Sequence, residues 1–539
     1  MLANIANRIK NQAEQQPDNP AIIYPCKGSV SQLTFSQTES LINSYARGFQ
    51  KIGIQQGDRV SLFVTPCLEF MPMCFALYKI GAILVLIDPG MGREGLLSCV
   101  QRIKPRVLIG IPKAMFASLL FGSYFSSVEI KVTVGWGSWL WGGYRLSKIK
   151  SPDSSPLHCA PTTTNCEASI LFTSGSTGPA KGVRYTHGIF EAQTDQLQSM
   201  YDIKAGERDL PCFPLFGLFS LAMGMTVVIP EMDPTKPAKA NPKVLTDAIK
   251  KYNITNAFAS PALWKPFAQY CVVNNMQLPT LQRILSAGAP IPPILHKQFQ
   301  SILSAGAEVH TPYGATESLP VATIGSKEVL EDTQFRTQKG DGTCVGHPVP
   351  EITVQIISIH DNVIEEWSED LCVPEGEVGE ICVQGAVVTS EYKEEHEHTR
   401  KAKIYGKNGS FWHRMGDLGY FDKQGRLWFC GRKSHRVQCK DGTLMFPVPC
   451  EAIFNQHPSV SRSALIELNG TPIIVIEKNP HMQCTAEELL ELGATNPKTS
   501  SIKHLLFHPA FPVDVRHNAK IKRLILRDWA KQIWTEPSS

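Results

Sequence analysis

The sequence predicts an α/β fold that ends in a small α+β domain. Up to about residue 345, amphipathic helical segments alternate with nearly all-apolar strands, the pattern of sheets covered by crossover helices. After that point the expected strands are short and bounded by turns, which indicates a β-rich part. A charged segment with a glycine, near Arg432–Arg436, then leads into a smaller C-terminal unit. We therefore divide the chain into residues 1–432 and 433–539.

Apolar periodicity along the chain places the individual elements. In the N-terminal part we expect helices at 37–52 and 69–80, and strands at 59–64, 82–87, 106–111 and 254–259. In the β-rich part we expect strands at 352–359, 379–384 and 425–429. The strand at 82–87 is apolar on both faces, which is typical of a parallel strand between two layers of helices.

Composition excludes several classes of protein. Of the 539 residues, 43% are hydrophobic and 19% are charged, which is typical of a globular chain and not of a disordered one. The net charge of +4 is too small to indicate binding to nucleic acid. The fifteen cysteines include no C-x-x-C pair, so zinc ribbons and thioredoxin-like sites have no support. Because the N-terminus lacks the apolar core of a signal peptide, we expect a cytoplasmic protein with reduced thiols.

One uncharged stretch, residues 210–230, is about long enough to cross a bilayer. It contains three prolines and two glycines, which a lone membrane span tolerates poorly. We therefore expect a buried helix that runs into a buried strand at Thr226–Ile229, with a membrane span as the alternative. We expect no integral span in the chain, and peripheral association with a membrane stays open.

The strongest local signal is a run of hydroxyl residues and glycines that follows the apolar strand 170–172. Its members are Thr173, Ser174, Gly175, Ser176, Thr177, Gly178 and Lys181. Glycines let backbone N–H groups approach an anion, hydroxyls donate further hydrogen bonds, and a lysine adds positive charge. The run lacks the G-K-[ST] ending of a Walker A loop. It predicts a polyphosphate site, and the alternative is a flexible turn.

This loop resembles the signature of the acyl-adenylate-forming superfamily, which includes acyl-CoA synthetases, peptide-synthetase adenylation domains and luciferases. Further resembling stretches follow in the same order, at 286–290, 313–317, 415–417, 431–434 and 511–521. The resemblance covers essentially the whole chain. It implies an N-terminal domain of two α/β subdomains and a distorted β-barrel subdomain, followed by a small mobile α+β domain. It also implies an enzyme that uses ATP and Mg²⁺ to activate a carboxylic acid as an acyl-adenylate, with release of pyrophosphate.

The resemblance assigns nucleotide-binding roles to five residues. Gly288 and Ala289 belong to the turn beside the adenine, and Tyr313 stacks on that base. Asp417 accepts hydrogen bonds from both ribose hydroxyls. Arg432 lies near the ribose and the phosphates, at the domain boundary.

The resemblance also implies which residues carry the chemistry. Thr316 contacts the α-phosphate, and Glu317 binds Mg²⁺ together with Thr173, because a hard cation prefers oxygen ligands. Lys520 matches the mobile lysine that bridges the carboxylate and the α-phosphate while charge builds up. Basic neighbours of Lys520 do not change our expectation that the protein binds no nucleic acid. A non-catalytic, nucleotide-binding relative is a further alternative, but it would be expected to lack some of these residues.

Two departures argue against CoA in the second step. CoA ligases usually carry a G-G-x-x-[IV]-x-P stretch after the hinge, and the matching stretch, Cys439–Pro449, has one glycine in place of two. In those ligases the motif at Phe213–Phe216 includes a gate aromatic or histidine, and here Gly217 follows. The usual attack by a pantetheine thiol is therefore in doubt.

Four stretches are similar to the β-lactone synthetases of bacterial olefinic-hydrocarbon biosynthesis, at 229–238, 313–320, 431–437 and 508–520. This resemblance implies a long-chain 2-alkyl-3-hydroxy acid as the small-molecule substrate. After adenylation, the 3-hydroxyl would attack the activated carbonyl and close a β-lactone as AMP leaves. The alternative is a long-chain fatty acid–CoA ligase. A complex with other enzymes of the hydrocarbon pathway also stays open.

A large apolar acid needs an apolar tunnel. The candidates for its lining are Phe213, Phe216, Phe219, Leu221 and Met223, with an ordinary core as the alternative. The base for the 3-hydroxyl is not evident from the sequence. An adenylate phosphate oxygen and a nearby histidine are the two options.

Overall fold

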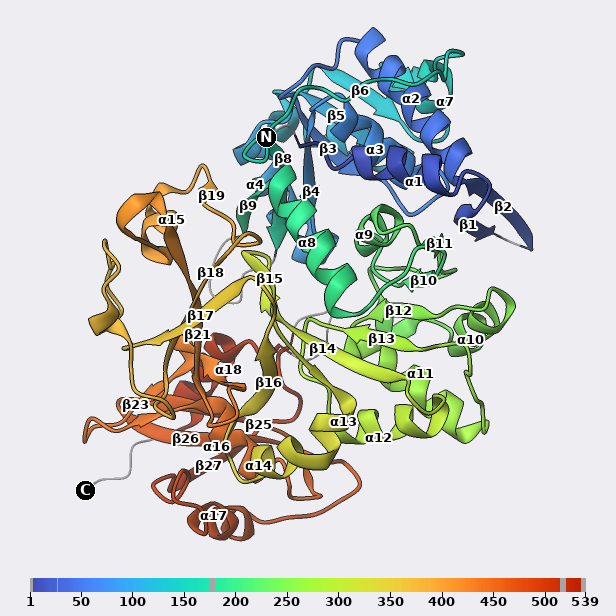
Figure 1. Ribbon diagram of the computed structural model, residues 1–539. Helices are drawn as coiled ribbons and strands as arrows, with labels where there is room; N and C mark the ends of the chain where they lie inside the picture. The colour runs from blue at the N-terminus through green and yellow to red at the C-terminus, as the bar shows by residue number, and fades with distance from the viewer. Residues whose placement is uncertain (1–2, 27, 174–179, 514–519, 535–539) are drawn as a thin grey trace.

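Two large sheets with helices on their faces form most of the protein, and a smaller unit follows at the C-terminal end (Figure 1). The computed structural model describes residues 3–26, 28–173, 180–513 and 520–534. In Figure 1 the chain runs from the blue N-terminal layers at the top to the orange and red C-terminal unit at the lower left. The expected mixture of large α/β layers, a β-rich part and a C-terminal α+β unit is confirmed.

The first sheet has eight strands, which are mainly parallel. In spatial order they are β19 (Tyr392–Lys393), β9 (Lys181–Thr186), β8 (Glu167–Thr173), β4 (Ile83–Ile87), β3 (Arg59–Phe63), β5 (Val107–Gly110), β6 (Ile130–Thr133) and β7 (Tyr144–Arg145). The helices of this part are α2 (Phe35–Lys51), α3 (Phe70–Lys79), α4 (Gly92–Ile103), α5 (Pro112–Leu120), α6 (Ser138–Trp141), α7 (Leu146–Ile149) and α8 (His187–Met200). The strands expected at 59–64, 82–87 and 106–111 are β3, β4 and β5, each one or two residues shorter.

The second sheet has fourteen strands and continues from a parallel part into an antiparallel part. In spatial order they are β17 (Ile352–Ile357), β18 (Gly379–Gly385), β21 (Phe411–Phe421), β22 (Leu427–Arg432), β16 (Thr343–Pro348), β15 (Ser318–Gly325), β14 (Glu308–Ala315), β13 (Arg283–Ser286), β12 (Asn256–Ala259), β10 (Arg208–Pro211), β11 (Thr226–Val228), β1 (Pro20–Cys26) and β2 (Ser29–Thr34), with β20 (Lys403–Tyr405) beside β21. Helices α10 (Pro242–Lys251), α11 (Pro261–Val273) and α12 (Pro293–Ile302) connect its parallel strands. The change from parallel to antiparallel pairing falls at β14, which pairs with β13 in parallel and with β15 antiparallel.

Helix α2 begins two residues before the start expected from periodicity. The Thr34 hydroxyl accepts a hydrogen bond from the backbone N–H of Gln37, and the Gln37 side chain accepts one from the backbone N–H of Thr34. This reciprocal capping box satisfies two donors that the first turn would otherwise leave unpaired. The cap therefore sets the helix start at Phe35, while the apolar pattern sets only its buried face.

The uncharged stretch 210–230 folds inside the protein, as expected. It contains the end of β10, then the short helix α9 (Phe216–Ala222), then the buried strand β11. No helix among the described residues is long and apolar enough to cross a membrane.

After β22 the remaining elements build separate small sheets. They are β23 (Val437–Gln438), β24 (Leu444–Met445), α16 (Pro447–Phe454), β25 (Val460–Leu468), β26 (Thr471–Lys478), α17 (Ala486–Ala494), β27 (His504–Phe507) and α18 (Arg523–Ile533). Two apolar clusters, one on each side of the β25–β26–β27 sheet, form the core of this unit.

A buried ionic cluster lies where the chain leaves β22. Glu380, on β18, contacts the Arg414 guanidinium at 2.6 Å and the Lys433 ammonium at 3.0 Å. The side chains of Glu380 and Arg414 are 1% and 3% exposed. Arg414 also donates hydrogen bonds to the backbone carbonyls of His360 and Asn362. Lys433 follows β22 directly, so this cluster ties the start of the C-terminal segment to the β-rich part.

Candidate active site

The turn between β14 and β15 carries Thr316 and Glu317. Groups from other parts of the chain fix its backbone. Tyr185 donates its hydroxyl to the Thr316 carbonyl at 2.6 Å, and the Gln193 side chain donates to the Leu319 carbonyl at 2.8 Å. The backbone N–H of Thr389 donates to the Glu317 carbonyl at 2.9 Å. The turn is therefore held by three independent donors, which fixes the direction of both functional side chains.

The Glu317 carboxylate is joined through Tyr392 to strand β9, which begins at Lys181. The Tyr392 hydroxyl donates to Glu317 Oε1 at 2.5 Å, and the Lys181 ammonium lies 5.1 Å from the centre of the Tyr392 ring. Strand β19 makes this possible, because Tyr392 pairs with Val183 on β9, two residues after Lys181. Burial and the neighbouring carboxylate raise the pKa of Tyr392, so it remains a neutral hydrogen-bond donor.

Asp417 lies at the centre of a second group of polar residues. The Tyr313 hydroxyl donates to Asp417 Oδ2 at 2.7 Å, and the Arg432 guanidinium lies 2.9 Å from Oδ1. Asp417 and Arg432 are cross-strand partners on β21 and β22. Burial raises the pKa of Asp417, and the charge of Arg432 opposes that shift. Oδ1 is buried and accepts no hydrogen bond within the described part of the chain, which leaves an acceptor for a ligand hydroxyl.

The structure thus brings together most of the described residues that the sequence singles out. Contacts link Lys181 to Glu317 through Tyr392, and Tyr313 to Arg432 through Asp417. Because Tyr313 and Glu317 belong to one β14–β15 hairpin, these two groups are parts of the same site.

The small-residue turn after β13 lies beside that hairpin, because β13 and β14 are parallel neighbours. Gly288 has a φ of +94°, a backbone conformation that residues with a Cβ rarely adopt. Ala289 follows it. Ala287, the residue before Gly288, and Thr316 both line one large apolar cavity, so the turn borders the candidate site.

The remaining residues of the expected site are those of the glycine- and hydroxyl-rich loop, Thr173 and Lys520. Ser174, Gly175, Ser176, Thr177 and Gly178 lie outside the described residues. Thr173 is the last residue of β8, where its backbone pairs with Lys181, and its side chain is not described. Lys520 is exposed on the C-terminal unit. It directly precedes Ile521, which forms an isolated antiparallel β-bridge with Val513.

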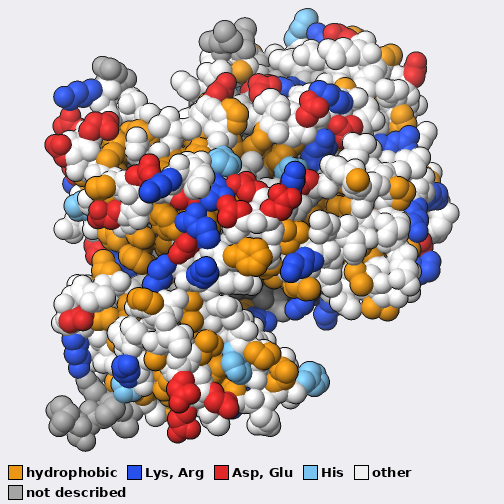
Figure 2. Space-filling model, turned by 60° about the horizontal axis from the view of Figure 1, so that its bottom comes forward, with side chains coloured by type: hydrophobic (Ala, Val, Ile, Leu, Met, Phe, Trp, Pro, Cys, Tyr) orange, Lys and Arg blue, Asp and Glu red, His pale blue; other side chains and the backbone are white. Residues whose placement is uncertain are grey.

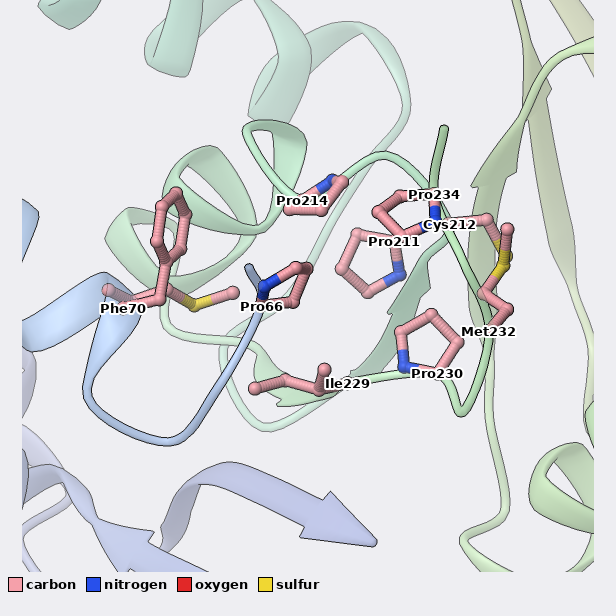
Figure 3. A pocket seen from close by; sticks show the side chains of 10 residues that line it. Pro66, Phe70, Pro211, Cys212, Pro214, Ile229, Pro230, Met232 and Pro234 are labelled. Atoms are coloured by element: carbon pink, nitrogen blue, oxygen red, sulfur yellow. The ribbon is translucent and has the colours of Figure 1, made fainter. Parts of the chain in front are cut away.

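An apolar cavity of about 860 Å³ opens onto the Thr316 turn. Its lining includes Phe213, Phe216, Phe219 and Met223, whereas Leu221, the fifth candidate, is buried in the neighbouring core cluster. A separate small pocket, which shares Pro66, Pro214 and Pro234 with this cavity, is lined by proline rings from three segments of the chain (Figure 3). The ring atoms come from Pro66, Pro211, Pro214, Pro230 and Pro234. The stretch 229–238, which carries part of the resemblance, contributes Asp233, Pro234 and Thr235 to the lining of the large cavity.

Gly217 packs where a side chain has no room. A Cβ at this position would lie 2.4 Å from the end of the Met71 side chain and 3.2 Å from the Pro211 ring. Methionine can move aside, but the proline ring cannot move without its backbone. Position 217 therefore has little space for a gating side chain.

Sequence reasoning missed four residues around this site: Tyr185, Tyr392, Lys403 and His413. Lys403 is fully buried, donates to the Thr389 carbonyl and lies 3.1 Å from His413 Nδ1. Burial lowers the pKa of Lys403 to about 7 and, together with that lysine, lowers the pKa of His413 well below its usual value. None of the four stands in a recognisable motif, and only the tertiary structure brings them near Glu317.

We expect Asp417→Asn to weaken nucleotide binding more than it weakens the fold. The substitution replaces an ionised acceptor with an amide, and hydrogen bonds to charged groups contribute about 1.5–3 kcal/mol each. Such a loss corresponds to a rise of roughly 10- to 100-fold in the KM for ATP. The measurement is ATP-dependent pyrophosphate release, with Asp153→Asn as a matched control. Asp153 also pairs with an arginine, Arg47, but its side chain is 57% exposed. An unchanged KM for ATP in Asp417→Asn would contradict this assignment.

Comparison with known proteins identifies the family of this chain. The AMP-binding enzyme family model matches residues 9–393. An olefin β-lactone synthetase from Xanthomonas campestris pv. campestris is 42% identical over 98% of both chains, and one from Stenotrophomonas maltophilia is 41% identical, also over 98% of both.

Among solved structures, an amide bond synthetase from Marinactinospora thermotolerans superimposes with a TM-score of 0.80 at 21% identity. The alignment covers 97% of this chain and 99% of that one, and it shows a shared fold. The match over most of the chain, together with the two relatives above 40% identity, establishes that this chain belongs to the AMP-binding enzyme family, in the group that contains the olefin β-lactone synthetases.

Proposed function

We propose that the protein uses ATP to activate a long-chain 2-alkyl-3-hydroxy acid and then closes a β-lactone. In the first step a carboxylate oxygen of the acid attacks the α-phosphorus, and pyrophosphate leaves. In the second step the 3-hydroxyl oxygen attacks the acyl carbon, the bond to the phosphate oxygen breaks, and AMP leaves. The products are a four-membered lactone, AMP and pyrophosphate, so CoA has no part in the reaction.

The observation that carries this proposal is the apolar cavity that ends at the Thr316–Glu317 turn. Its volume of about 860 Å³ lies near the upper end of the range for small-molecule pockets. Because Thr316 is part of its lining, the carboxyl end of a bound acid would lie beside the polar cluster, with the alkyl parts among phenylalanine rings. The relatives at 41–42% identity, named olefin β-lactone synthetases, support the lactone as the product.

The described residues fit a nucleotide. Asp417 Oδ1 is ion-paired with Arg432 but accepts no hydrogen bond within the described part of the chain, so it suits a ribose hydroxyl, and Arg432 suits a phosphate. Lys181 supplies a positive charge at the phosphate-loop strand, and the loop residues from Thr173 to Gly178 belong to the same proposed site. Gly288, Ala289 and Tyr313 would form the adenine side.

The donor set also fits Mg²⁺. Glu317 offers one carboxylate in a half-buried turn, and no cluster of three or more His, Cys, Asp or Glu residues is present in the described ranges. One carboxylate together with water and phosphate oxygens is the usual protein contribution to a magnesium site. When bound, Mg²⁺ would neutralise charge on the departing pyrophosphate. Tyr392 keeps the Glu317 carboxylate oriented, and Thr316 and Thr173 would contribute hydroxyls.

We further infer that residues 433–539 move as a unit to deliver Lys520. The connection after Arg432 is short, and the ion pairs Lys433–Glu380 and Arg436–Asp361 fix its position in this structure. Closure of such a domain would exclude water, which competes with the 3-hydroxyl for the activated carbonyl.

The proton of the 3-hydroxyl needs an acceptor in the second step. None of the described residues that line the cavity is a histidine. A phosphate oxygen of the adenylate, which lies next to the acyl carbon by its own covalent structure, is therefore the better of the two options.

The reaction is tested by incubating the enzyme with ATP, Mg²⁺ and a 2-alkyl-3-hydroxy acid, without and with CoA. We expect equal release of AMP and pyrophosphate in both cases and a lactone mass equal to that of the acid minus water. The 3-deoxy analogue of the acid is the matched control: it should form an adenylate and no lactone. A strict requirement for CoA, or an acyl-CoA product, would overturn the second step and leave a CoA ligase.

A further inference from the structure

An exposed apolar stripe runs along α5. Phe116, Leu119 and Leu120 are spaced as neighbours on one helix face, and Phe116 and Leu120 are 62% and 67% exposed. The other side of the same helix is different, because Ala114 and Ala117 line the substrate cavity. Helix α5 is therefore a thin wall between that cavity and the outside of the protein.

The exposed apolar surface continues onto α6, which packs against α5. Trp139 and Trp136 are 81% and 65% exposed, and Leu140 is also exposed. Trp141 faces inward and donates its indole N–H to the Thr133 hydroxyl at 2.8 Å. That contact fixes α6 so that its other large side chains point outward. We call the exposed residues of α5 and α6, with Trp136, the apolar patch.

Basic residues lie on the same side of the first sheet as the apolar patch. Residues 107–152 contain one acidic residue, Glu129, which pairs with Arg106 at 2.7 Å. Three of the five basic residues in this range lie on the patch side: Lys113 is on α5, Lys131 is two residues before Thr133 on β6, and Arg145 pairs with Thr133, which contacts Trp141. The other two, Lys148 and Lys150, belong to α7, which packs against α2 on the opposite face. Exposed tryptophan, phenylalanine and leucine beside lysine and arginine are typical of surfaces that insert into the headgroup region of an anionic bilayer.

The cavity reaches the surface next to the apolar patch. Two of its lining residues, Arg93 and Lys113, are exposed. Arg93 lies over the ring of Phe121, a third lining residue, at 5.6 Å. A ligand that leaves an apolar phase at this mouth would enter the cavity without crossing bulk water.

We propose that the apolar patch docks the protein on a bilayer surface that contains anionic phospholipid, with the mouth of the cavity facing the lipid. The aromatic and leucine side chains insert among the headgroups, and the lysines and arginines on the same side contact the lipid phosphates. This surface lies on α5 and α6, away from the nucleotide-binding residues on β14, β21 and β22, so docking leaves the site on those strands uncovered.

The test is flotation of the full-length protein with vesicles of phosphatidylglycerol and phosphatidylcholine, compared with vesicles of phosphatidylcholine alone. We expect preferential binding to the anionic vesicles and release by high salt. Leu120→Ser combined with Trp139→Ser should lower the affinity at least tenfold. Lys131→Gln combined with Arg145→Gln should lower it about fivefold for each charge removed.

The matched control is Val273→Ser combined with Ile294→Ser, because these two side chains are 67% and 64% exposed on other helices. It should bind vesicles like the unmodified protein, and all variants should keep its thermal unfolding temperature. The assay involves no turnover, so its outcome is separate from that of the proposed reaction. Equal flotation of patch and control variants would overturn the proposal. The proposal would also be overturned if the protein did not bind anionic vesicles and formed an oligomer that the patch variant converts to a monomer. The patch would then join copies of this chain.

Discussion

Replacing Lys520 with alanine should lower the rate of acyl-adenylate formation by roughly 10²- to 10³-fold, the effect of removing one preorganised group that stabilises transition-state charge. The ammonium would lie between the carboxylate and the α-phosphate, where negative charge accumulates as pyrophosphate leaves. The measurement is pyrophosphate release in single-turnover experiments with saturating ATP and acid.

Two comparisons make this result specific. Lys522→Ala removes an equally charged and exposed side chain two residues away and should leave the rate within about twofold. The rate at which a synthetic acyl-adenylate is converted to lactone and AMP should be little changed in Lys520→Ala, because the lysine acts before that intermediate forms. A variant that forms adenylate at the original rate would contradict the delivery of Lys520 to the site.

Replacing Glu380 with glutamine should destabilise the protein by about 3–5 kcal/mol, the usual cost of leaving a buried charge without its partner. Arg414 is 3% exposed and would keep its charge, while its carbonyl contacts to His360 and Asn362 cannot supply the missing negative charge. The glutamine has nearly the same volume, so no cavity adds to the effect. The measurement is the shift of the urea unfolding midpoint at a constant slope.

The control for this prediction is Glu365→Gln. Glu365 also pairs with an arginine, Arg400, but their side chains are 61% and 56% exposed. Surface pairs of this kind contribute about 0–1 kcal/mol, so this variant should unfold close to the midpoint of the unmodified protein. Glu380→Gln should also alter the connection to the C-terminal unit through Lys433, which limited proteolysis of that segment would detect. Equal stability of the two variants would show that the Glu380 cluster is solvated in solution.

Local pattern was sufficient to predict several elements. The strand expected at 82–87 is β4, because an apolar run with no polar face can be stable only between two layers of helices. The uncharged stretch 210–230 folds as helix α9 and strand β11, because its prolines and glycines interrupt any continuous span. The start of α2 was missed by two residues, since the capping box at Thr34 and Gln37 depends on side-chain hydrogen bonds and not on apolar period.

The sequence by itself determined the order of the layers, the motif residues and the family resemblance, because these depend on residue type and short spacing. Only the tertiary structure decided how they meet. The Tyr392 hydroxyl reaches Glu317 across 75 residues of chain, and Tyr313 reaches Asp417 across 104. The cavity behind α5 and the small proline-lined pocket also depend on packing between segments far apart in sequence. Periodicity records which side of an element is buried, but contacts between distant elements are set by the register and packing of whole sheets.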